Sequence, residues 1–117
     1  MLEDKARDLG RTIGQTPEYQ AVKRANDALT GDRDAMTLLR DLEKLRVEAA
    51  RMIERGQEPS PEMEKQLDEL LAKAQGNALY QQVVVAQSNF DKLMMRVNEW
   101  IMDGIAKGAA SPIITLG

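Results

Sequence analysis

Apolar residues near the C-terminal end of the chain recur at alternating steps of four and three. The run consists of Leu79, Val83, Ala86, Phe90, Leu93, Val97, Trp100 and Gly104. This alternation keeps one stripe of an α-helix facing a neighbouring helix along its whole length. A second run with the same alternation consists of Ala35, Leu38, Leu42, Leu45, Ala49, Met52 and Gly56. Two such seams predict an all-α protein built for contact between helices.

Start and stop signals divide the chain into about five helices. Thr16 and Ser60 each precede a proline and a glutamate, which is the order of an N-cap, a first helical residue and a first-turn acid. Asp32 and Asn77 are further N-cap candidates, although Gly76 leaves open a bend in one continuous helix instead. The predicted helices span residues 2–13, 17–29, 33–55, 61–75 and 78–107.

The chain of 117 residues corresponds to one domain. We expect a single helical domain over residues 1–107 and a flexible C-terminal tail over residues 108–117, which lack helical periodicity. The two long helices, 33–55 and 78–107, are expected to form an extended antiparallel helical hairpin or bundle. The sequence leaves open whether their seams pair within one chain or between two.

The length of the last helix indicates self-association. About 29 residues of helix extend over roughly 44 Å, whereas a compact domain of this size has a diameter of roughly 35 Å. One protomer cannot cover the whole seam with a compact core, so we expect a homodimer.

The end of the last helix carries the candidate interaction surface. Trp100 is the only tryptophan of the chain, and it fits an interface anchor or a core position at the base of the bundle equally well. Methionines beside it suit a surface that repacks against more than one partner. The candidate interaction residues are Phe90, Leu93, Met94, Val97, Trp100 and Ile101.

The composition excludes many catalytic chemistries. The chain has no Cys and no His, which excludes disulfides, thiolate metal sites, Cys nucleophiles and His general bases. Acids such as Asp27, Asp32 and Asp34 stand where helix caps and first-turn acids belong. We therefore expect no enzymatic activity, no cofactor and no metal site.

Charge and hydropathy favour a cytoplasmic protein. The net charge is −3, and the 16 basic and 19 acidic residues are interleaved, so no basic surface for nucleic acid forms. The N-terminus lacks the features of a signal peptide, and no apolar run reaches the length of a membrane span. We expect no direct binding to nucleic acid or membrane.

Several short segments in a fixed order carry a family resemblance. They are Gln15-Thr16-Pro17-Glu18-Tyr19, Ala25 to Leu29, Asp32, Arg55-Gly56-Gln57-Glu58, Ser60-Pro61-Glu62, Asn77-Ala78-Leu79-Tyr80, and the stretch from Ala86 through Phe90, Leu93 and Val97 to Ile105. No single segment is diagnostic, but their order and spacing resemble the YlbF/YmcA family of small bacterial helical proteins. The resemblance covers nearly the whole chain except about the last dozen residues.

The resemblance implies an all-helical fold, self-association and a regulatory role without catalysis, in competence, sporulation, biofilm formation or RNA processing. Some relatives bind iron–sulfur clusters through cysteines. This chain has none, so neither that property nor membership of the relatives' complex is carried over. The resulting hypothesis is a non-catalytic cytoplasmic helical adaptor or regulator that binds an unknown protein partner. The alternative is a chaperone-like or structural helical module that binds apolar segments.

Overall fold

The computed structural model describes residues 1–110 and contains all five predicted helices. They are α1 (Leu2–Gly14), α2 (Pro17–Thr30), α3 (Arg33–Glu54), α4 (Pro61–Gly76) and α5 (Ala78–Ala110). No strand occurs among these residues. The predicted all-α class is confirmed.

Side-chain caps begin four of the helices, as predicted. In each case the cap oxygen accepts a hydrogen bond from the backbone N–H three residues later, at 2.9–3.2 Å. The four caps are Thr16, Asp32, Ser60 and Asn77. The backbone at Asn77 is extended, with φ −78° and ψ 124°. α4 and α5 are therefore two helices, and the alternative of one helix bent at Gly76 is wrong.

Gly56 closes the end of α3, also as predicted. Its φ of +76° lies in the left-handed region. The N–H of Gly56 donates to the carbonyl of Ile53 at 3.0 Å, and the N–H of Gln57 donates to the carbonyl of Met52 at 2.8 Å. These two bonds form a Schellman motif, which satisfies carbonyl groups that a helix end leaves unpaired.

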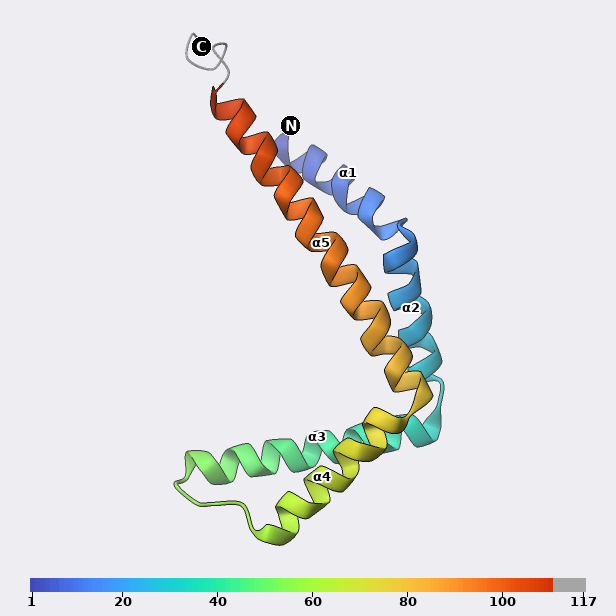
Figure 1. Cartoon of the computed structure of the whole chain (residues 1–117), viewed down its shortest axis with the longest axis vertical. Coiled ribbons are helices and arrows are strands. Elements are labelled where there is room, and N and C mark those ends of the chain that lie inside the picture. Colours follow the sequence, from blue (N-terminus) through green and yellow to red (C-terminus); the bar gives the residue numbers. More distant parts are fainter. Residues whose placement is uncertain (111–117) are drawn as a thin grey trace.

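The helices form two pairs set at an angle to each other (Figure 1). α2 packs along the first half of α5, and α3 packs along α4. Contacts of α4 with α5 and of α2 with α3 join the two pairs. The described part of the chain measures 68 × 37 × 19 Å and has a radius of gyration of 21.4 Å. A compact domain of this length has a radius of about 13 Å, so this molecule is extended.

The two long helices do not form the predicted hairpin with each other. α3 and α5 point in different directions from the junction of the two pairs (Figure 1). Each is covered by a shorter helix instead, α3 by α4 and α5 by α2. The physical reason is that a four–three seam specifies that some helix lies against it but does not specify which one.

α5 also ends later than predicted, at Ala110 and not at Lys107. A glycine such as Gly108 costs only about 1 kcal/mol inside a helix, and the two alanines that follow are the strongest helix formers. The first three residues of the predicted tail are therefore helical. Its remainder, 111–117, lies outside the described residues.

The buried core is small and is built mainly from small side chains. Val22 and Ala25 of α2 meet Ala86 of α5. Further side chains that pack against this cluster are Ala21, Val83 and Phe90. The other pair buries Ala35, Leu42, Ala49 and Ala74. Alanines let the helix axes approach closely. Within residues 1–110 no large side chain is fully buried, so few contacts hold the tertiary structure together.

Replacing Gly56 by alanine tests the helix end. We expect Gly56→Ala to lower the free energy of unfolding by about 1 kcal/mol, because a Cβ disfavours the left-handed conformation. Gly76→Ala is the matched control. Gly76 is helical, and an added Cβ would meet nothing within 4 Å, so we expect stabilisation by about 0.5–1 kcal/mol. Urea denaturation measures both, and equal effects would contradict the assignment.

Candidate protein-interaction surface

The first half of α5 uses its apolar seam inside the chain. Phe90 packs against the cluster of Val22, Ala25 and Ala86. Its ring lies edge-on to the ring of Tyr19 on α2, with 5.4 Å between centroids and an interplanar angle of 61°. This geometry is favourable for an aromatic pair. The pair therefore marks the place where α2 begins to cover α5.

The second half of α5 is largely uncovered. Its exposed large apolar side chains are Met95 (64%), Trp100 (63%), Ile101 (42%), Met102 (63%) and Ile105 (57%). Over residues 100–110 the only charged side chains are Asp103 and Lys107, which form an ion pair with each other at 3.0 Å. A helix that is apolar on most sides is normally buried. This segment is as apolar as a buried helix, yet its large apolar side chains are exposed to solvent.

α1 presents a second uncovered apolar face. Leu2, Ala6, Leu9 and Ile13 share one side of the helix, yet α1 contains no buried residue. Leu2 is 84% exposed and Leu9 is 39% exposed, whereas Ile13 next to α2 is partly buried.

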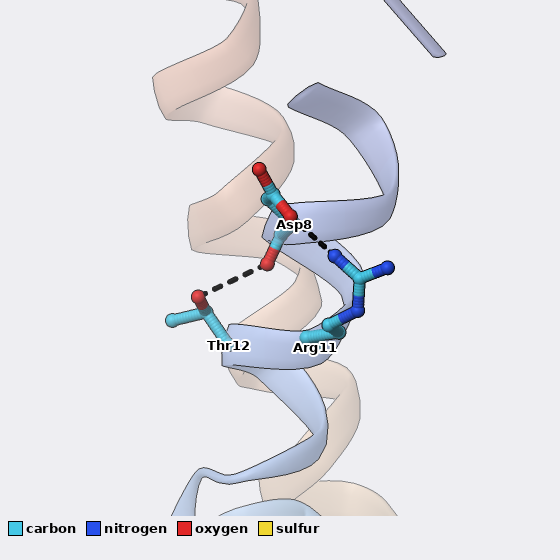
Figure 2. Close-up of polar contacts among 3 residues, drawn as sticks. All are labelled: Asp8, Arg11 and Thr12. Carbon is cyan, nitrogen blue, oxygen red and sulfur yellow. Dashed lines mark hydrogen bonds and ion pairs between the residues drawn. The ribbon is translucent and has the colours of Figure 1, made fainter. Parts of the chain in front are cut away.

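Most polar side chains of α1 make their contacts within the helix itself, whereas the carbonyl of Gly14 at its end accepts from the side-chain amide of Gln20 on α2 at 2.8 Å. Arg11 pairs with Asp8, and the hydroxyl of Thr12 donates to the carbonyl of Asp8 at 3.1 Å, as Figure 2 shows. Arg7 pairs with Glu3 one turn away. Contacts of this kind add only a few tenths of a kcal/mol each, and an isolated helix of 13 residues is marginal in water. Burial of the apolar face against another molecule would supply the stabilisation that these contacts do not.

The structure divides the six candidate interaction residues into two groups. Val97 is 5% exposed, and Phe90, Leu93 and Met94 are partly buried. Trp100 and Ile101 lie on the surface. Of the two positions that the sequence allowed for Trp100, the structure places it at the surface. The role of these six residues in binding stays a prediction.

Sequence reasoning left Leu2 and Leu9 of α1, and Met95, Met102 and Ile105 of α5, out of the candidate surface. Their signal was present, because Leu2 and Leu9 belong to a regular helical stripe and the methionines stand beside Trp100. The sequence does not indicate which apolar stripes are covered by other helices of the same chain.

An open groove also runs between α2 and α5. Its floor is made of small side chains, including Ala21, Ala25, Ala28 and Ala86, and Val85 at its edge is 59% exposed.

Among residues 1–110, no group of three or more His, Cys, Asp or Glu side chains is placed to hold a metal ion. No helix in this part of the chain is long and apolar enough to cross a membrane.

Comparisons with known proteins agree on one family. Residues 2–106 match the family described as control of competence regulator ComK, YlbF/YmcA. A UPF0342 protein of Streptococcus agalactiae serotype V is 32% identical over 98 residues, which cover 78% of this chain and 88% of the relative. A UPF0342 protein of Leuconostoc mesenteroides is 24% identical over 106 residues, which cover 91% of each chain.

Two solved structures share the fold. One is a chain of the X-ray crystal structure of Bacillus subtilis RicA in complex with RicF, with a TM-score of 0.79, 16% identity, and coverage of 92% of this chain and 96% of that one. The other is a protein of unknown function (DUF964) from Bacillus stearothermophilus, with a TM-score of 0.66, 20% identity, and coverage of 95% and 97%. At these identities the likeness establishes the helical arrangement alone.

Substitution of the two aromatic residues on α5 separates core from surface. We expect Phe90→Ala to lower the free energy of unfolding by about 2–4 kcal/mol, because it removes the ring that packs on α2. Trp100→Ala should change it by less than about 0.5 kcal/mol in dilute solution, because the side chain is exposed. Urea denaturation followed by circular dichroism measures both. Equal losses would show that Trp100 is a core residue.

Proposed function

Because this chain belongs to the YlbF/YmcA family, we propose that it is a non-catalytic helical adaptor that regulates another protein by binding it. The observation that carries this proposal is the uncovered apolar surface of α1 and of the second half of α5. Family membership confirms the resemblance that the sequence segments indicated.

Exposed apolar area of this extent is unfavourable in water. Each 100 Å² that a partner covers contributes about 2.5 kcal/mol before the costs of association. Large contiguous apolar patches that stay exposed on a folded chain mark interaction sites. α1 is also the least anchored helix, so its burial against a partner would order it at the same time.

The partner that suits this surface is a protein with an amphipathic helix. The apolar stripe of α1 is straight and regular, which favours recognition of a second helix laid along it. The structurally similar RicA chain was crystallised in complex with RicF. By analogy, we propose that a protein partner covers the α1 face here.

The finer parts of the proposal come from the sequence. We propose that the chain acts in the cytoplasm as a homodimer. Of the processes that the resemblance implies, control of competence is the one that the family description names. The missing Cys and His residues are consistent with regulation through binding.

A substitution on the α1 stripe tests the adaptor function. We expect Leu9→Glu to reduce capture of the natural partner by about tenfold or more, because it places a charge inside the apolar contact. Arg11→Gln is the matched control. It changes the net charge by the same amount on the opposite side of α1 and should leave capture unchanged. The measurement is affinity purification of the tagged chain from its native cells, with quantification by mass spectrometry.

Three results are informative. One stoichiometric partner that Leu9→Glu releases supports the adaptor. Many unrelated apolar segments bound in small amounts would favour the chaperone-like module instead. Full retention of the partner by Leu9→Glu would contradict the assignment of the α1 face.

A further inference from the structure

A second stripe runs along α5 on the side away from its buried seam. Its four charged residues, Lys92, Arg96, Glu99 and Asp103, recur at steps of four, three and four. Met95 and Met102 lie beside them, seven residues apart, and all six side chains are exposed. Met95 and Met102 expose 64% and 63% of their side chains. Ala86 and Val97, the two buried residues of α5, lie on the other side of the helix. This stripe, called the outer face below, therefore takes no part in the packing of the chain.

The charges of the outer face are ordered in two blocks. Lys92 and Arg96 are positive and one turn apart, and Glu99 and Asp103 are negative and one turn apart. Like charges at this spacing repel each other on an isolated helix. Over residues 1–110, Lys92, Arg96 and Glu99 form no ion pair, and Asp103 pairs with Lys107 alone. The chain thus leaves both blocks without compensation from its other helices.

We propose that the outer face of α5 packs antiparallel against the same face of a second copy of this chain. This inference rests on the proposed function, because it specifies the surface through which the adaptor dimerises. Antiparallel packing places Lys92 opposite Asp103 of the second copy, and Arg96 opposite Glu99 of the second copy. Both pairings put the two-fold axis at the same point, between Val97 and Asn98, so one register satisfies all four contacts.

The apolar side chains of the outer face fit nearly the same register. Met95 lies close to Met102 of the second copy, and the two-fold axis repeats the contact. Trp100, at the edge of the face, comes near the guanidinium of Arg96 of the second copy, where a cation–π contact is favourable. Asp103 can keep Lys107 on one carboxylate oxygen while the other accepts from Lys92 of the second copy.

The order of the charges identifies a second copy as the occupant. A surface that lies on a two-fold axis must be complementary to itself. The outer face carries two positive charges followed by two negative charges. In an antiparallel pair the second copy runs in the opposite direction, so its negative charges lie opposite the positive charges of the first copy. Parallel copies would instead set Lys92 against Lys92 and Asp103 against Asp103.

Two charge-reversal variants test the proposal. Lys92→Glu/Arg96→Glu makes the outer face entirely negative, and Glu99→Lys/Asp103→Lys makes it entirely positive. We expect each to self-associate about tenfold or more weakly than the natural chain in sedimentation equilibrium, because every contact then joins like charges. An equimolar mixture of the two should form a one-to-one heterodimer. Helix content by circular dichroism should remain unchanged.

The variant with all four substitutions tests the orientation. It carries two negative charges followed by two positive ones, so antiparallel copies complement each other again and association should return to the natural level. Parallel copies would face like charges in this variant as in the natural chain. Lys65→Glu/Lys73→Glu on α4 is the matched control, since it reverses two exposed lysines elsewhere and should leave association unchanged.

Several outcomes would overturn the inference: a natural chain that is monomeric at high micromolar concentration, double variants that self-associate normally, a mixture that does not form heterodimers, or a fourfold variant that stays monomeric. The adaptor function is tested separately. Partner capture depends on Leu9 of α1, so capture that persists when the outer-face test fails would overturn the dimer geometry alone.

Discussion

The structure depends on a difference in length between two packed helices. α5 has 33 residues and α2, its main packing partner, has 14. At the α-helical rise these are about 50 Å and 21 Å long. Alanines at the contact bring the two axes close together over that shorter distance. Beyond Val97 the seam of α5 continues, but no helix within residues 1–110 buries its end. The surface available for binding is the direct consequence.

The second pair, α3 with α4, gives the molecule its bent shape and does not reach the end of α5 (Figure 1). α1 continues the path of α2 yet buries none of its residues. The chain therefore combines two modestly packed helix pairs with two segments, α1 and the end of α5, whose apolar side chains are largely exposed. Any ligand that binds the folded chain stabilises it by mass action. Binding to α1 and the end of α5 should thus order the segments that intramolecular packing holds least.

Local features of the fold could be predicted from the sequence, whereas helix pairing could not. The caps at Thr16, Asp32, Ser60 and Asn77 depend on residues within one turn, so each was visible in the sequence. The pairing of α3 with α4 was missed because a four–three seam is the same whichever helix covers it. The position of Trp100 was undecided for the same reason: a core seam and an interface seam have identical spacing. Trp100 is exposed because α2 begins to cover α5 near Phe90 and does not extend along α5 as far as Trp100.

Hydrogen exchange of the backbone amides tests most directly the claim that α1 and the end of α5 are built to be covered by another molecule. In dilute solution, amides in the buried stretches of α2, α3 and the first half of α5 should be protected. Those of α1 and of residues 98–110 should exchange fast. Higher protein concentration should protect the end of α5, and bound partner should protect α1. Strong protection of both segments in the dilute isolated chain, unchanged by either addition, would contradict the account.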